Sequence, residues 1–249
     1  MTHTAFTPEQ YEAIYPSGIE HHYWNHCRNR IIYDVLKRYS LHTKNVFEIG
    51  CGRGIVTAYL ARHRVCIEGN EVASVPVEEI IRPFVHTGID ALQLPEEKRK
   101  MAEVILLADV IEHIEDPRTF LEDILHAFPR AAHILITVPA CREIWSNYDE
   151  FNGHFRRYEM DDLFELATSL QMEVKRIQYM FHALWIPARI LAKMKKERNV
   201  FLTPPRGITK IFHRLLSFYF YLEYKIFPGD LKGTSLMLYM RRKNNAFKN

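Results

Sequence analysis

Short apolar runs alternate with amphipathic segments along most of the chain. Each of the first five runs is stopped by glycine, proline or an acidic residue, which is typical of buried strands: 45–50, 64–71, 83–90, 103–109 and 132–139. Other segments repeat apolar residues at helical spacing: 19–39, 54–63, 76–81, 116–128 and 159–170. This alternation predicts a doubly wound α/β fold, with parallel strands and helices on both faces of the sheet.

The pattern changes after residue 139. A loop is expected over 140–158, and strands six and seven at 172–181 and 234–242. The sequence between these two strands is aromatic, basic and helical in pattern. We therefore expect a mostly parallel seven-stranded sheet in one domain, 1–249. Its parts would be an N-terminal cover helix region, a core, a helical insertion, and a last strand with a tail: 1–42, 43–180, 181–232 and 233–249.

Charge is distributed unevenly between the two ends of the chain. Residues 1–174 contain 17 Lys and Arg against 27 Asp and Glu, whereas residues 175–249 contain 16 against 3. The basic C-terminal third either meets an acidic partner or forms a solvated face beside the acidic body. With 47% hydrophobic residues in 249, the chain can bury one substantial core.

Cysteine usage and the N-terminal segment indicate the compartment. The four cysteines are far apart, with no CxxC pair: Cys27, Cys51, Cys66 and Cys141. This spacing predicts a reduced, cytoplasmic chain without a disulfide framework or a zinc knuckle. The segment 1–18 has no basic region followed by an apolar one, so no signal peptide is expected.

Candidate chemistry begins at the first strand. VFEIGCGRG (46–54) reads as a strand, a tight glycine turn and a helix start, which brings the backbone close to a ligand. Ile55 stands where the dinucleotide fingerprint GxGxxG needs glycine. Glu48 lies inside the apolar strand, where a carboxylate is costly unless it is satisfied. That acid suits a cationic ligand better than a pyrophosphate.

Three more acids follow the next three strands. Glu71, Asp90 and Asp109 would all lie at the carboxyl ends of parallel strands, where doubly wound sheets bind their ligands. Glu71 is placed to chelate ribose hydroxyls, and Asp90 to accept from an adenine amino group. Any one of these acids can be a helix cap. Capping does not explain all of them in register behind a glycine loop.

Four motifs at the ends of predicted strands carry a family resemblance: EIGCGRG, GNE, GIDA and DVIEH. As a set they resemble the class I S-adenosylmethionine-dependent methyltransferases, from about residue 20 to residue 242. The resemblance implies a Rossmann-like methyltransferase fold. It also implies S-adenosyl-L-methionine as cofactor and S-adenosyl-L-homocysteine as product.

The resemblance further implies roles for individual residues. The first strand and its loop would hold the methionine moiety, through Glu48, Gly50, Cys51, Gly52 and Gly54. Glu71 would bind the ribose, Asp90 and Ala91 the adenine, and Asp109 would face the same side of the sheet. Asn70 stands where the family usually has an apolar residue, which leaves Glu68 as a rival for the ribose contact.

Three segments resemble one branch of that family: HYWNHCRNR (22–30), GHFRRY (153–158) and TSLMLYMRRK (234–243). The branch implies that Trp24 and Arg28 cover the cofactor, with Arg28 near the methionine carboxylate. Core packing of the N-terminal helix is the alternative role for Trp24.

The residues after the fourth predicted strand indicate the acceptor. DVIE replaces the N/D-P-P-Y/F of amine- and DNA-methylating relatives, which disfavours nucleic acid. Asp109, Glu112, His113 and His154 resemble the metal-binding E-x-x-E-H…H of small-RNA 2′-O-methyltransferases and the E-x-x-E-H of ubiquinone-type O-methyltransferases. We expect His154 or His113 to act as a general base beside Glu112. A divalent metal held there is a less favoured alternative, and a plain helix start a third.

The predicted function is O-methylation of a small or lipid-linked acceptor. The alternatives are a metal-dependent RNA 2′-O-methyltransferase and a cofactor-binding scaffold without catalysis. Neither 179–198 nor 208–228 has 18 uncharged residues, so a transmembrane span is not expected. This basic, aromatic insertion is either a surface that docks on anionic membrane, a substrate lid or homodimer interface, or additional core.

Overall fold

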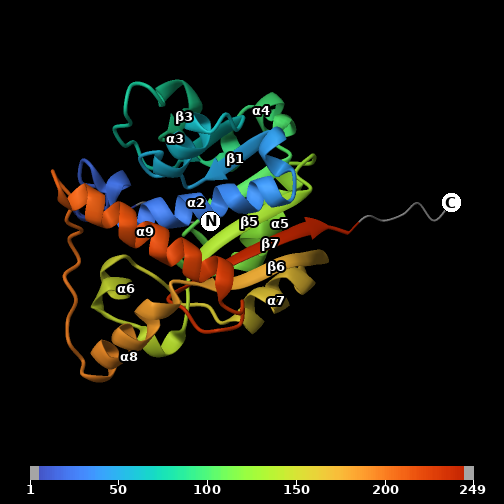
Figure 1. The fold of residues 1–249 in the computed structure, drawn as a ribbon. Coiled ribbons are helices and arrows are strands. Elements are labelled where there is room, and N and C mark those ends of the chain that lie inside the picture. Colours follow the sequence, from blue (N-terminus) through green and yellow to red (C-terminus); the bar gives the residue numbers. More distant parts are fainter. Residues whose placement is uncertain (1–5, 244–249) are drawn as a thin grey trace.

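Seven strands form one sheet in the order β3-β2-β1-β4-β5-β7-β6 (Figure 1). The computed structural model describes residues 6–243, so the predicted tail at 244–249 lies outside it. The strands are β1 (Val46–Ile49), β2 (Ile67–Glu71), β3 (Val85–Thr87), β4 (Val104–Ala108), β5 (His133–Pro139), β6 (Met172–Met180) and β7 (Ser235–Arg242). The first five are parallel, and β7 runs antiparallel between β5 and β6. The predicted mostly parallel seven-stranded fold is confirmed.

The centre of the sheet is apolar on both faces because helices cover both. Along β4, Ile105 and Leu107 pack into one core, while Val104 and Leu106 pack into the other. All four side chains are fully buried. A strand with this environment is a continuous apolar run, which is why VILLA shows no alternation of polar and apolar residues.

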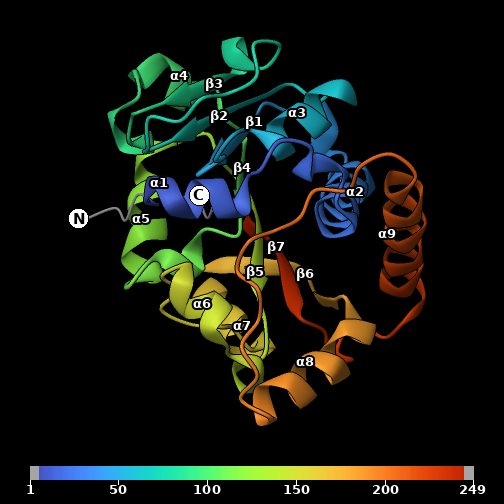
Figure 2. The same ribbon diagram turned by 90° about the vertical axis from the view of Figure 1, so that its left-hand side faces the viewer.

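Two layers of helices enclose these cores (Figure 2). One face is covered by α2 (Tyr23–Arg38), α3 (Ile55–Arg62) and α9 (Thr209–Ile226), and the other by α5 (Pro117–Ala127) and α7 (Met160–Ser169). The start of α5 follows from its sequence: Oδ1 of Asp116 accepts a hydrogen bond from the Thr119 amide at 3.1 Å, and Pro117 occupies the first turn.

Several local predictions need correction. The segment 76–81 is not helical but ends in a turn. Ile81 is its one buried residue. So short a segment, with so little burial, does not offset the cost of helix nucleation. The helix expected over 19–39 is divided at His22, which separates η1 (Ile19–His21) from α2. Three further helices were not predicted: α1 (Pro8–Ile14), α4 (Glu96–Met101) and α6 (Asn147–Phe151), the last inside the expected loop.

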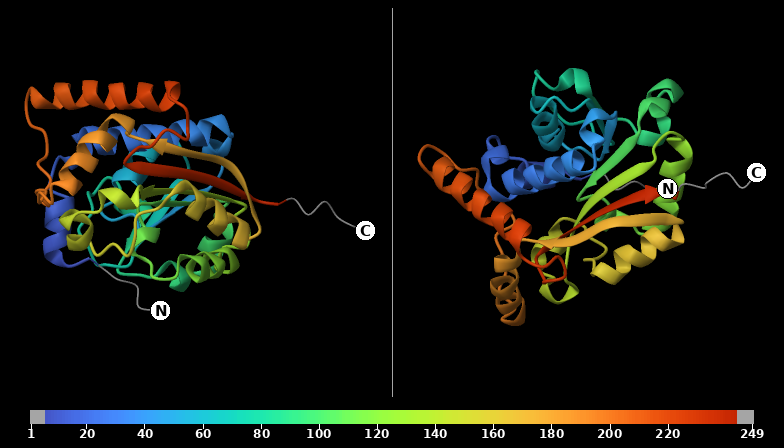
Figure 3. Two further views of the ribbon diagram at one scale, coloured as in Figure 1. Left: turned by 90° about the horizontal axis from the view of Figure 1, so that it is seen from below. Right: turned by 45° about the vertical axis from the view of Figure 1, so that its right-hand side comes forward.

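The insertion between β6 and β7 is helical, as predicted. It contains α8 (Trp185–Lys193) and α9, joined by an extended connection that crosses the molecule (Figures 2 and 3). This connection is held at two places: the Leu202 amide donates to the Ala13 carbonyl at 2.9 Å, and the Arg198 amide donates to the Asn147 side chain at 2.8 Å. Within residues 6–243, no helix is long and apolar enough to span a membrane.

Candidate functional site

The glycine loop after β1 leaves no room for side chains. Gly50 has φ +73°, and a Cβ there would lie 2.8 Å from Cγ2 of Val110. Gly52 has φ +55°, and a Cβ there would lie 2.5 Å from the Tyr15 hydroxyl. Both conformations and both contacts therefore require glycine. Oε2 of Glu71 accepts a hydrogen bond from the Gly52 amide at 2.9 Å, which ties the end of β2 to this loop.

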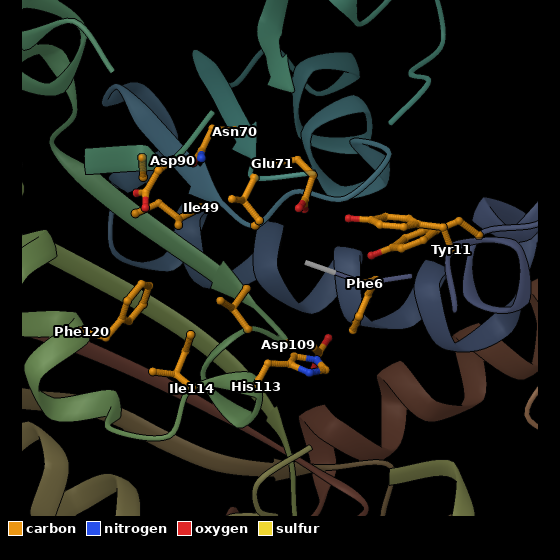
Figure 4. A pocket seen from close by; sticks show the side chains of 15 residues that line it. Phe6, Tyr11, Ile49, Asn70, Glu71, Asp90, Asp109, His113, Ile114 and Phe120 are labelled. Atoms are coloured by element: carbon orange, nitrogen blue, oxygen red, sulfur yellow. The ribbon is translucent and has the colours of Figure 1, made fainter. Parts of the chain in front are cut away.

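A pocket of about 100 Å³, partly open to solvent, lies at the carboxyl ends of β1, β2 and β4 (Figure 4). The strand ends and their loops contribute Gly50, Glu71, Asp90, Ala91 and Asp109 to its wall. These are five of the eleven residues predicted for the cofactor, and the structure brings them together around one cavity.

The two ends of the pocket differ in character. Figure 4 shows Asp90 and Asn70 near Ile49 at one end, with Phe120 and Ile114 across the cavity, and Tyr11 and Phe6 at the other end. Oδ1 of Asp90 accepts from the Leu92 amide at 2.9 Å, so this acid is a cap as well as a wall residue. Oδ1 of Asn70 is buried and has no hydrogen-bond partner in the described part of the chain.

These features fit S-adenosylmethionine. An unpartnered buried amide oxygen and the Asp90 carboxyl offer acceptors beside an apolar wall, which suits the adenine. The Glu71 carboxylate suits ribose hydroxyls. The glycine loop admits a ligand close to the backbone, and the acidic wall suits a sulfonium cation.

Other predicted cofactor residues lie behind the wall of the pocket rather than on it. Cys51, Gly52 and Gly54 belong to the loop but are not lining residues. Glu48 is 1% exposed and accepts a hydrogen bond from the Thr57 hydroxyl. Burial raises the pKa of Glu48 to about 7, against the opposing effects of Thr57 and Arg28. Contact of this carboxyl with the cofactor stays a prediction.

Glu68, the predicted rival for the ribose, is directed elsewhere. It pairs with His86 Nε2 at 2.8 Å and with Lys98 Nζ at 2.6 Å, and it does not line the pocket. Glu71 is therefore the acid of β2 that faces the cavity.

Arg28 reaches the pocket through an ion pair. Its Nη1 contacts Oδ2 of Asp109, and its guanidinium lies 4.6 Å from the ring centroid of Trp24. Trp24 in turn stacks on Phe181 at 5.9 Å between centroids. Asp109 adopts φ +59°, and its amide donates to the Thr137 carbonyl at 2.9 Å. Trp24 thus packs within the core, and Arg28 positions Asp109 at the cavity.

The predicted catalytic residues converge. Glu112, His113 and His154 each present a donor atom, and these atoms all lie within 4.8 Å of one another. The rings of His113 and His154 meet edge to face at 4.7 Å, and His113 lines the pocket. Asp109, the first acid of the motif, is paired with Arg28 and is not in this group.

Burial sets the protonation of two members of the group. It raises the pKa of Glu112 well above its usual range, and the nearby charge of Asp109 adds to this effect. Burial and the neighbouring His154 lower the pKa of His113 to about 3. Burial therefore favours the protonated, neutral form of Glu112 in the folded chain, and the His113 ring is neutral at neutral pH.

His154 has a carboxylate partner that the sequence did not reveal. Its Nδ1 lies 2.9 Å from Oδ1 of Asp149, which also accepts from Arg157 Nε at 2.8 Å. Asp149 is fully buried. Burial alone would raise its pKa, but the hydrogen bond from His154 and the charge of Arg157 outweigh burial and lower it. The ionised Asp149 orients the imidazole of His154 so that Nε2 accepts a proton.

The N-terminal segment supplies another wall that was not predicted. Tyr11 and Tyr15 stack with ring centroids 5.8 Å apart, and both line the pocket with Phe6. Burial and the Glu71 carboxylate raise the pKa of Tyr11, which keeps its hydroxyl protonated. Thr7 and Gln10 form a capping box that starts α1, and this sequence pattern could have indicated the helix.

Comparison with known proteins places this site in a family. A family model described as a methyltransferase domain matches residues 23–199. The chain belongs to this family. The match covers the glycine loop, the acids at the strand ends and the histidine group, and it stops before α9.

Curated relatives match over shorter stretches. A ubiquinone biosynthesis O-methyltransferase from Pseudomonas entomophila is 26% identical over 92 residues, which are 34% of this chain and 40% of that protein. Its mitochondrial counterpart from Schizosaccharomyces pombe is 24% identical over 131 residues, 47% of this chain and 46% of that protein. The chain thus spans about half or less of the length of these relatives.

Solved structures share the fold of this methyltransferase-domain chain. Haemonchus contortus phosphoethanolamine N-methyltransferase 2, in complex with S-adenosyl-L-methionine, has a TM-score of 0.52 at 14% identity, covering 86% of this chain and 52% of that one. The [4+2]-cyclase SpnF has a TM-score of 0.54 at 16% identity, covering 88% and 82%. The methyltransferase-domain match supports the predicted cofactor, S-adenosylmethionine, and its product, S-adenosylhomocysteine.

Proposed function

We propose that the chain transfers the methyl group of S-adenosylmethionine to a hydroxyl group of a small or lipid-linked acceptor. The observation that supports this most is the His154–Asp149 pair, which lies behind the pocket residue His113, because a hydroxyl acceptor needs a base. The fold alone does not decide the reaction, since SpnF, a cyclase, has it too.

In this proposal the cofactor, when bound, supplies an activated methyl group. The glycine loop and Glu71 bind it, and Arg28 holds Asp109 in place. His154 Nε2 would take the proton of the acceptor hydroxyl during methyl transfer. Asp149, held by Arg157, stabilises the imidazolium that results. His113 lines the pocket as a neutral ring and helps to position the acceptor.

The acceptor class rests on two observations. The curated relatives are ubiquinone biosynthesis O-methyltransferases, whose name indicates a lipid-linked substrate for those proteins. The aromatic ring of Phe6 lines the pocket of this chain and meets the ring of His113 edge to face at 4.9 Å between centroids. Both favour an acceptor with an apolar body and one reactive hydroxyl.

A metal-assisted version is a second candidate, and one observation favours it. The donor atoms of Glu112, His113 and His154 are close enough to bind a single divalent cation. A metal there would lower the pKa of a bound hydroxyl and would keep Glu112 ionised. In that case His154 is a ligand and not the base.

A methyl-transfer assay tests the proposal. The chain is incubated with labelled S-adenosylmethionine and a panel of phenols, alcohols and amines, with and without a chelator, and products are identified by mass spectrometry. An O-methyl product is expected, with turnover reduced roughly 10²–10⁴-fold in His154→Ala and cofactor affinity retained. N-methyl products alone, or full activity in His154→Ala, contradict the base assignment. Loss of activity with the chelator and its return with Mg²⁺ or Zn²⁺ would select the metal-assisted version.

A matched control is available on α7. Phe164 is 55% exposed and lies on the helix layer that covers the opposite face of the sheet from α9. Phe164→Ser is expected to leave both turnover and cofactor affinity unchanged.

A further inference from the structure

The helix α9 carries two apolar faces, and residues 6–243 cover only one of them. Its inner face packs against α2 and β6 through residues that include Leu216, Phe220 and Tyr224. Its outer face has a second stripe at helical spacing, through Ile211, Leu215, Phe218, Leu222 and Ile226. A helix that is apolar on both sides is normally buried on both.

The outer stripe is open to solvent. Ile211 is 61% exposed, Leu215 64% and Ile226 71%, and Phe212 beside them is 63% exposed. Figures 1 and 3 show α9 on the outside of the molecule, with α2 behind it. Large contiguous apolar surface of this kind marks an interaction site.

Charge identifies the partner. Between residues 199 and 229 the sequence has four cations, Arg206, Lys210, Arg214 and Lys225, and a single acid, Glu223. Glu223 is 3% exposed, and its carboxylate accepts from the Ala183 amide at 2.7 Å, so it points inward. Lys225 pairs with Asp34 of α2 at 3.0 Å, so the cations that lie beside the apolar stripe are Arg206, Lys210 and Arg214.

We propose that α9 is a membrane-docking helix that lies in the interface of an anionic bilayer, with the stripe 211–226 inserted and the flanking cations at the headgroups. A peripheral amphipathic helix binds in this way, through buried apolar area together with attraction to anionic lipid. The helix does not span the bilayer, consistent with the absence of a spanning helix in residues 6–243.

The position of α9 gives the docking a consequence for the site. Phe220 of α9 meets Phe181 at 5.5 Å between ring centroids, and Phe181 stacks on Trp24, which lies against Arg28. A bilayer bound to α9 therefore lies on the side of the molecule that carries α2, whose Arg28 pairs with the pocket residue Asp109. This arrangement brings the pocket near the surface from which a lipid-linked acceptor would come, although the docking itself does not depend on the identity of the acceptor.

The experiment is vesicle co-sedimentation of the full chain in 0.15 M salt. One set of vesicles is phosphatidylcholine with 30% phosphatidylserine, and the other is pure phosphatidylcholine. The wild type is expected to bind the anionic vesicles at least roughly fivefold more tightly, because each cation at the surface contributes on that scale. The double variant Phe212→Ser/Leu215→Ser should bind the anionic vesicles at least roughly tenfold more weakly than the wild type.

Two controls keep the result specific. Phe164→Ser removes an equally exposed aromatic ring from α7 and is expected to change binding less than twofold, and circular dichroism verifies that each variant is folded. Lys210→Ser/Arg214→Ser should lose the preference for anionic over neutral vesicles.

Three outcomes overturn the proposal. One is no binding of the wild type to anionic vesicles, and another is equal binding of the wild type and the Phe212/Leu215 variant. The third is that light scattering shows the wild type to be a dimer and the Phe212/Leu215 variant to be a monomer, while neither binds vesicles. This outcome would assign the stripe to contact with a second copy of the chain. Cofactor binding, measured on the same samples, separates failure of this proposal from failure of the proposed methyl transfer.

Discussion

Replacing Glu112 with glutamine should stabilise the folded chain at neutral and alkaline pH. Glu112 is 1% exposed, and its Oε2 has no hydrogen-bond partner within residues 6–243. Burial and the charge of Asp109 raise its pKa in the folded state well above 4.5, the value expected for the unfolded chain. Folding therefore requires a proton on Glu112 at pH values where the unfolded chain has released it.

The magnitude follows from proton linkage. Above pH 4.5, the unfolded state binds fewer protons than the folded state at this site, so stability falls as pH rises, by about 1.4 kcal/mol per pH unit, until the folded pKa is reached. At pH 7.5 the effect is at most about 4 kcal/mol, since that pH lies about three units above the unfolded pKa. Glutamine has nearly the same shape and no charge to lose, so Glu112→Gln removes the penalty.

Urea denaturation at pH 4.5, 6 and 7.5, with a chelator present, measures the effect. The variant should exceed the wild type in free energy of unfolding at pH 7.5 by about 1–4 kcal/mol, and the difference should shrink toward zero at pH 4.5. Glu115→Gln, at an exposed acid three residues later, should show no such trend. The reasoning is refuted if Glu112→Gln is less stable at pH 7.5, or if its difference from the wild type does not depend on pH.

Three further changes test other parts of the site. Asp149→Asn should lower the free energy of unfolding by about 2–3 kcal/mol at pH 7 by breaking a buried ion pair. Because the pKa of Asp149 is depressed in the folded state, the stability that it gives is present above its unfolded pKa of 3.8 and is lost as pH falls through the folded pKa. Urea melts in acid should therefore show the difference between variant and wild type closing. Gly52→Ala should destabilise by about 1–3 kcal/mol in thermal melts, since its Cβ meets Tyr15 at a positive φ. Arg28→Ala should cost about 3–5 kcal/mol by leaving Asp109 unpaired, while Arg28→Lys should lose less; urea melts that rank them the other way contradict this role of the ion pair.

The strands of the core could be predicted because each is an apolar run ended by a glycine, a proline or an acid. Strands that are buried on both faces contain few polar residues, so the continuous apolar runs of β4 and β5 were enough to predict them. The convergence of Glu71, Asp90 and Asp109 followed from topology, because parallel strands end at the same edge.

Other features depend on contacts between distant residues and could not be predicted. Asp149 is an acid in a segment expected to be a loop, and only folding places it 2.9 Å from His154. Tyr11 lies in the N-terminal helix α1 and Tyr15 caps its end, and the place of this helix over the glycine loop is set by tertiary packing. Glu48 was expected at the ligand because an acid in an apolar strand needs a partner; the structure supplies that partner in Thr57, nine residues later.

Isothermal titration of the full chain with S-adenosylmethionine tests the central claim most directly. We expect saturable binding, with the product S-adenosylhomocysteine as competitor. Glu71→Ala should weaken it roughly tenfold or more, because the carboxylate that ties the Gly52 amide and faces the cavity is lost. Glu68→Ala, which removes an acid of the same strand that is paired with His86 and Lys98, should bind as the wild type does. No binding by the wild type, or equal weakening in both variants, would contradict the assignment of this pocket.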